Sequence, residues 1–130
     1  MDLHHTYDTY KDRAAFLTIY ISEAHPEDEW QTDSNVEDKI VFKQPTTFNE
    51  RQELAKVLVD RLKYRVPVAI DGIENAADKA YAAWPERIYV IAAGGRIVYK
   101  GGMGPFGFKP DEAEKRLAEH LAAAAGQATD

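Results

Sequence analysis

The ending of the chain limits its fold more than any other part of the sequence. Two short apolar segments, 87–92 and 97–100, flank a turn at 93–95 that is rich in glycine, and this spacing predicts an antiparallel hairpin. Pro110 then stands where a helix can begin, and we expect that helix to run to about Ala125. A strand pair followed by a helix needs other apolar elements to cover it, so the earlier residues must supply a layered α/β core.

The first part of the chain predicts a helix and a strand. Leu3, Tyr7, Tyr10 and Ala14 recur at helical spacing with charged residues between them. The next segment, 16–21, is a nearly continuous run of β-branched and aromatic residues, which is typical of a parallel strand covered on both faces. An acidic, irregular stretch follows this strand.

The middle of the chain predicts a helix, a strand and a further helix. Thr47 and Glu50 have the spacing of a capping box at the start of the first helix. A strand at 66–71 and a helix at 74–83 come next. We expect the first helix to bury a stripe of four apolar residues: Leu54, Val57, Leu58 and Leu62.

Composition limits the domain count and the partners. With 130 residues, of which 45% are hydrophobic, the chain suits one domain over 1–125 with a disordered tail at 126–130. Its net charge of −6 argues against nucleic acid or an anionic membrane as a partner. The apolar runs are too short to span a bilayer and no signal-peptide core precedes them, so a cytoplasmic location is expected.

The predicted order is helix, strand, helix, strand, helix, strand, strand, helix. An α/β order that ends with a hairpin and a helix is typical of a thioredoxin-like fold, a mixed sheet flanked by helices. In that fold a proline directly before the penultimate strand is commonly cis, and Pro85 stands at this place. Phe106 and Phe108 are expected to pack against the last loop.

Two segments resemble the iodothyronine deiodinases. Residues 20–30, YISEAHPEDEW, are similar to the family's apolar strand that ends in Glu-Ala-His and is followed by Asp and Trp. Residues 84–113 resemble its Pro-Glu-Arg, Gly-Arg-Ile, Tyr-Lys-Gly, Gly-Pro and Pro-Glu pattern. Ser22, Glu29 and Pro45 depart from the animal enzymes and fit a bacterial-type relative better.

The resemblance implies an oxidoreductase that removes halogen from an aromatic substrate with the help of an external thiol and no cofactor. Glu23 would be the acid, His25 the proton relay, and Trp30, Pro85 and Arg87 would contact the substrate. The family's nucleophile is cysteine or selenocysteine, and this chain contains no cysteine. The nucleophile would then lie before Met1, and the chain as given would be inactive.

Simpler interpretations exist for each of these residues. Glu23 and His25 on their own are ordinary residues at a strand end, and with two nearby carboxylates they lack recognised metal-ligand spacing. Trp30 could cover the core, and Arg87 could be a surface group. A non-catalytic binding or assembly module and a peroxiredoxin-like peroxidase fragment are therefore alternatives to the deiodinase-like function.

The resemblance also implies that a central strand, the one that precedes the nucleophile, is absent between 16–21 and 87–92. Unpaired strand edges between apolar faces cost stability. We therefore expect one of three arrangements: direct pairing of the two strands, a strand supplied by another chain, which would make a homo-oligomer, or marginal stability with an open slot.

Overall fold

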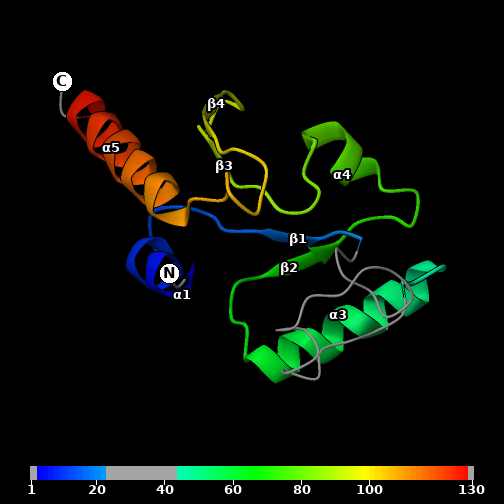
Figure 1. The fold of residues 1–130 in the computed structure, drawn as a ribbon. Coiled ribbons are helices and arrows are strands. Elements are labelled where there is room, and N and C mark those ends of the chain that lie inside the picture. Colours follow the sequence, from blue (N-terminus) through cyan, green and yellow to red (C-terminus); the bar gives the residue numbers. More distant parts are fainter. Residues whose placement is uncertain (1–2, 23–43, 129–130) are drawn as a thin grey trace. The chain divides into compact units, whose positions relative to one another are not determined.

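A computed structural model describes residues 3–22 and 44–128, which form two compact units (Figure 1). The parallel unit is Phe16–Pro85, and the hairpin unit combines Met1–Ala15 with Glu86–Asp130. The described helices and strands follow the predicted order, so the chain has the mixed α/β architecture of a thioredoxin-like fold. Each unit is built around one two-stranded sheet.

The parallel unit pairs β1, Thr18–Tyr20, with β2, Val68–Ile70. The strands run parallel, with Thr18 opposite Val68 and Tyr20 opposite Ile70. Helix α3, Phe48–Leu62, contacts β2, and the short helix α4, Ala76–Tyr81, follows that strand.

Helix α3 begins at the predicted capping box. Thr47 has an extended backbone with φ of −128°, and its hydroxyl accepts a hydrogen bond from the Glu50 backbone N–H at 3.1 Å. This bond satisfies one of the N–H groups that a helix start leaves without an intrahelical partner. At the other end, Lys63 adopts a left-handed conformation with φ of 51° and closes the helix. The capping-box prediction is confirmed.

The buried stripe of α3 differs from the prediction. Leu54 is buried, but Val57 is 36% exposed and Leu62 is 60% exposed. Arg51 and Ala55, which are 2% and 3% exposed, are instead buried with Leu54. The core-facing side of α3 is therefore turned toward Arg51, and the predicted burial of Val57 and Leu62 is wrong.

Burial alternates along β1, whereas the sequence predicted cover on both faces. Thr18 and Tyr20 are half-buried, but Leu17 is 63% exposed and Ile19 is 38% exposed. Val68 and Ile70 of β2 share the half-buried pattern. Because alternate residues of a strand point to opposite faces, one face of this sheet is covered and the other is not. The apolar run therefore overstated the burial of the strand.

The hairpin unit contains β3, Tyr89–Ile91, antiparallel to β4, Ile97–Lys100. In the turn, Gly95 has φ of 92°, a left-handed conformation that glycine adopts without the steric cost of a side chain. Helix α5, Pro110–Ala128, contacts both strands and extends beyond the expected end at Ala125. The predicted hairpin and the predicted helix start at Pro110 are both confirmed.

Helix α1, Leu3–Tyr10, belongs to the same unit and ends before the predicted Ala14. Its Thr6 is buried, and the Nε2 of His5 lies 3.7 Å from a carboxylate oxygen of Glu114 on α5. This ion pair joins the first and last helices.

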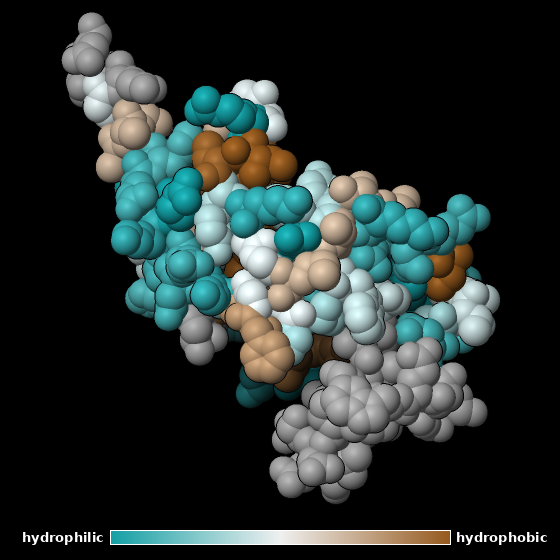
Figure 2. Space-filling view, turned by 45° about the horizontal axis from the view of Figure 1, so that its top comes forward, coloured by the Kyte–Doolittle hydropathy of each residue, from teal (hydrophilic) through white to brown (hydrophobic). Residues whose placement is uncertain are grey.

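In the described part of the chain, β1 pairs only with β2 and β3 only with β4. Strands β1 and β3 belong to different units, so the three expected arrangements around the absent central strand stay predictions. Phe106 is 92% exposed, so the expectation that it packs the last loop is wrong. On the face drawn in Figure 2, apolar side chains reach the surface in separate patches among hydrophilic ones. No helix among the described residues is both long enough and apolar enough to cross a membrane.

Candidate active site

The carboxyl ends of β1 and β2 meet at one edge of the parallel sheet. There the Asp71 backbone N–H donates to the carbonyl oxygen of Tyr20 at 2.9 Å. The side chain of Asp71, a residue only 5% exposed, accepts hydrogen bonds from the backbone N–H groups of Ala77 at 2.9 Å and Asp78 at 3.0 Å. One residue thus closes the strand pair and holds the first turn of α4. Ligand sites of open α/β sheets lie beyond this kind of edge.

Arg51 of α3 is a buried residue, and its side chain contacts the same edge of the sheet. Its Nη1 donates to the carbonyl oxygens of Asp71 at 3.2 Å and Gly72 at 2.7 Å, and its Nη2 donates to Oδ1 of Asn75 at 2.9 Å. Its Nε is buried with no hydrogen-bond partner among the described residues. We call Arg51, Asp71 and Asn75 the buried polar cluster. It ties α3, the end of β2 and the start of α4 together.

The electrostatics of the buried polar cluster favour an ionised Asp71. Burial raises the pKa of Asp71, but hydrogen bonds from the backbone of Asp78, Ala77 and Gly72 and the positive charge of Arg51 outweigh it. The net pKa of Asp71 is therefore lowered from its ordinary value of 3.8. At neutral pH the cluster contains a buried carboxylate beside a buried guanidinium.

Sequence reasoning did not single out the buried polar cluster. The available signal was the position of Arg51, three residues before Leu54 and seven before Leu58 on the same helix, which puts it on the core-facing side. An arginine on that side has to find acceptors inside the protein. The three acceptors come from a segment about 20 residues further along the chain, so local patterns did not reveal them.

Three of the predicted site residues, Glu23, His25 and Trp30, lie outside the described residues. Strand β1 ends at Tyr20, so in sequence Glu23 and His25 follow the carboxyl end of this strand. Pro85, the last residue of the parallel unit, is half-buried, and the Trp84–Pro85 peptide bond is cis. The predicted pocket around Glu23, His25 and Pro85 stays a prediction.

Arg87 belongs to the hairpin unit and has a structural contact there. Its Nε donates to the carbonyl oxygen of Gly101 at 2.6 Å, which joins the residues before β3 to those after β4. The side chain is half-buried. A role in substrate binding for Arg87 is therefore a proposal that has to account for this hydrogen bond.

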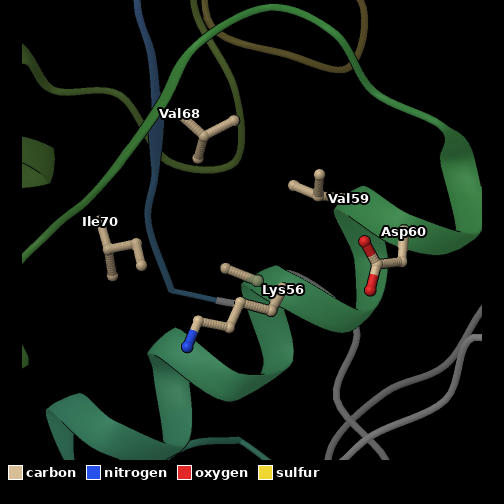
Figure 3. Close-up of a pocket in the computed structure, with 6 residues that line it drawn as sticks. Lys56, Val59, Asp60, Val68 and Ile70 are labelled. Atoms are coloured by element: carbon tan, nitrogen blue, oxygen red, sulfur yellow. The ribbon is translucent and has the colours of Figure 1, made fainter.

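The described residues form a groove but no metal-binding cluster. Within 3–22 and 44–128, no three His, Asp or Glu side chains are grouped closely enough to hold a metal ion. A shallow groove of about 400 Å³ lies between α3 and β2 (Figure 3). Val59, Val68 and Ile70 give it apolar walls, and Lys56 and Asp60 add one charge of each sign. It contains none of the predicted site residues.

Comparison of the sequence with known proteins identifies a family that the chain matches. A sequence model of the family described as iodothyronine deiodinase matches residues 2–121 of the chain. The matched part includes the segment that contains Glu23, His25 and Trp30, the buried polar cluster, Pro85 and most of the hairpin unit.

Individual relatives agree with the family match. Type I iodothyronine deiodinase of Xenopus laevis is 41% identical over 99 residues, which cover 76% of this chain and 37% of the relative. Thyroxine 5-deiodinase of Rattus norvegicus is 37% identical, and that of Homo sapiens 36% identical, each over 103 residues. These two alignments cover 79% of this chain and 32% of each relative, so the chain spans about a third of the relatives' length. The family match over residues 2–121 shows that the chain belongs to the iodothyronine deiodinase family.

Proposed function

We propose that this chain carries the proton-donating and substrate-binding parts of an oxidoreductase that removes iodine reductively from an aromatic ring. The observation that supports this proposal is the family match over residues 2–121, which includes the Glu-Ala-His sequence after β1. That sequence follows the carboxyl end of β1. At this edge of the sheet, the backbone N–H of Asp71 donates to Tyr20, and Arg51 donates to the carbonyl oxygen of Asp71.

The proposed reaction needs a soft nucleophile and an acid. A thiolate or selenolate attacks the iodine atom, the carbon–iodine bond breaks, and the iodine stays on sulfur or selenium. The aromatic carbon takes up a proton, which Glu23 supplies and His25 relays. An external thiol then displaces iodide from the nucleophile, and a second thiol restores it and leaves as a disulfide. The two electrons that reduce the substrate therefore come from two thiols.

The nucleophile is not among the 130 residues, because the sequence contains no cysteine. Histidine and carboxylate side chains are hard donors and poor acceptors of iodine, so they do not replace a thiolate. The chain alone is expected to bind the aromatic iodide without reducing it. The absence of cysteine equally favours a second candidate, a binding module of this family that does not catalyse the redox step.

The two candidates differ in a measurable rate. We would mix the chain with diiodotyrosine, an excess of a small selenol and a thiol, and follow iodide release with an ion-selective electrode. The deiodinase-like function predicts faster release than with the selenol alone, because the site holds the ring and supplies the proton. Glu23→Gln and His25→Ala should each remove most of this acceleration, by about a hundredfold where proton transfer limits the rate.

A matched control is Glu27→Gln, which neutralises a carboxylate in the same segment without touching the Glu-Ala-His sequence. It should leave the acceleration unchanged. Binding of diiodotyrosine without any acceleration would favour the module. Acceleration of peroxide reduction but not of iodide release would favour the peroxiredoxin-like alternative.

For partners, we propose an external thiol and a second copy of the chain, which would form a homo-oligomer by strand addition. We do not propose nucleic acid as a partner.

A further inference from the structure

Residues 72–84, which we call the strap, follow β2 at the carboxyl edge of the parallel sheet and contain α4 (Figure 1). The whole strap belongs to the parallel unit. An isolated helix shorter than about 12 residues is marginal in water, and α4 has only 6. Each residue of α4 is exposed or half-buried, so burial adds little to its stability. Contacts outside the helix must therefore hold it.

The start of the strap is held by the buried carboxylate of Asp71. One of its oxygens accepts from the Ala77 backbone N–H at 2.9 Å, and the other accepts from that of Asp78 at 3.0 Å. Both N–H groups lie in the first turn of α4, where a helix leaves such groups without an intrahelical partner. Asn75 stands at the usual capping position, but its side chain accepts from Nη2 of Arg51 instead. The carboxylate of Asp71 thus takes the place of the cap.

The end of the strap is held by Asp78. Its Oδ1 accepts from the Trp84 backbone N–H at 2.9 Å, and its carbonyl oxygen accepts from the Ala83 N–H at 3.0 Å. Ala82 has φ of 49°, a left-handed conformation that ends α4 and turns the chain back. Asp78 therefore takes part in both ends of the strap, because its N–H donates to Asp71 and its side chain accepts from Trp84.

This shared residue couples the two ends. Breaking the bond from the Asp78 N–H to Asp71 removes the cap of α4 and frees the carboxylate that holds Trp84. Breaking the bond from Trp84 removes a contact that closes the last turn. A helix this short forms or unfolds as a whole, because its first turn is costly to nucleate. Loss of either end should therefore release the entire strap.

We propose that the strap is a conformational device: residues 72–84 open and close as one unit, while β1 and β2 stay paired. Opening withdraws the carbonyl oxygen of Gly72 and Oδ1 of Asn75 from Arg51 and leaves its bond to the carbonyl oxygen of Asp71. The open form thereby frees the guanidinium at the edge where open α/β sheets bind ligands. The proposal does not rest on the proposed function.

The test is native-state amide exchange of the full chain, followed by nuclear magnetic resonance. Asp78→Ala removes the acceptor of the Trp84 N–H and keeps both backbone bonds from α4 to Asp71. Exchange should become about tenfold faster at Trp84, and faster by a similar factor at Ala77 near the other end. The amide of Asp71, which donates to Tyr20 in the sheet, should keep its rate.

Two variants separate the lost hydrogen bond from other effects of the substitution. Asp78→Asn removes the same charge but keeps the Oδ1 acceptor, so it should exchange at about the rates of the original chain. Lys79→Ala truncates an exposed side chain of the same helix and should change none of these rates. Alanine favours helices more than aspartate does, so faster exchange at Ala77 in Asp78→Ala would not reflect helix propensity.

The possible results point to different conclusions. Faster exchange at Trp84 with an unchanged rate at Ala77 would show that the end of the strap frays by itself, which would overturn the inference. Equal acceleration at Ala77, Trp84 and Asp71 would show that the whole unit opens, and would overturn it too.

A second measurement needs no substitution, so it does not depend on the folding of a variant. In low concentrations of urea, exchange of the original chain at Ala77, Ala83 and Trp84 should follow one common dependence on urea, distinct from that of Asp71. Separate dependences within the strap would contradict the proposal.

Discussion

The two compact units stabilise their small sheets by different means. The parallel unit joins strands that are 50 residues apart, Thr18 with Val68, and locks their carboxyl ends with a buried arginine and a buried aspartate. The hairpin unit joins neighbouring strands through a short turn, and its polar contacts to α5 lie near the surface. A two-stranded sheet is marginal by itself, so each unit depends on what accompanies its strands. The comparison indicates that the parallel unit depends on its buried polar cluster and the hairpin unit on contacts between residues that are close in sequence.

Loss of the buried guanidinium of Arg51 should lower the stability of the parallel unit more than any other change considered below. Arg51→Met leaves the carbonyl oxygens of Asp71 and Gly72 without their donor and Asp71 without its nearby positive charge. A buried acceptor that loses its hydrogen-bond partner costs about 1–3 kcal/mol, and Arg51 serves more than one such acceptor. Amide exchange should show faster exchange at Ala69 in β2, with Val90 in β3 changed much less.

The control for this change is Arg116→Met. Arg116 also donates to a carbonyl oxygen, that of Val98 at 2.7 Å, but its side chain is 50% exposed. Exposed charged contacts contribute about 0–1 kcal/mol, so the free energy of unfolding should change little. Equal losses from Arg51→Met and Arg116→Met would contradict the difference between the units.

Acid should weaken the parallel unit through Asp71. Its pKa is lower in the folded chain than the ordinary 3.8, so its contribution is fully present above about pH 3.8 and is lost as the pH falls through the folded pKa. Urea unfolding at a series of acidic pH values should show this loss, and Asp71→Asn should reduce the pH dependence. A dependence that Asp71→Asn leaves intact would assign the acid effect to other carboxylates.

A smaller effect is expected at the turn of the hairpin. Gly95 has φ of 92°, and Gly94 beside it has no such conformation, while neither has an atom within 4 Å of an added Cβ. Gly95→Ala should therefore cost about 1 kcal/mol through backbone strain alone, and Gly94→Ala much less. Thermal unfolding monitored at Tyr99 would measure both, and equal costs would show that the turn conformation is not the cause.

The smallest expected change concerns the contact between β4 and α5. Burial raises the pKa of Tyr99, and the charge of Glu112 raises it further, while Arg116 opposes this. The Tyr99 hydroxyl donates to the Glu112 carboxylate at 3.4 Å. Glu112→Gln should lower the pKa of Tyr99 toward its ordinary value of 10.0, as seen by ultraviolet titration. A rise instead would mean that Glu112 does not face the phenol.

The contrast between contacts among neighbouring residues and contacts among distant ones also explains which features could be predicted from the sequence. The hairpin, the helix start at Pro110 and the capping box at Thr47 depend on residues a few positions apart, and all three are confirmed. The exposure of Val57 and the burial of Arg51 depend on how α3 meets a strand and a loop that follow it by many residues. No local pattern records that arrangement.

For the candidate site, too, the sequence identifies residues but does not reveal how their side chains are placed. The sequence pattern identified Glu23 and His25 by resemblance, and the family match agrees with the resemblance, but the placement of their side chains is still a prediction. Phe106 was predicted to be packed, but it is exposed. The sequence places an aromatic residue among glycines and does not reveal in which direction its side chain points.

The central claim, that the Glu-Ala-His segment forms part of an aromatic-iodide site, is tested most directly by the imidazole signals. The chain has four histidines, so its nuclear magnetic resonance spectrum contains four sets of these signals, and His25→Ala assigns one of them. Titration with diiodotyrosine should shift the His25 signals in proportion to bound ligand and leave those of His120 on α5 unchanged. Saturable binding with no change at His25 would contradict the account.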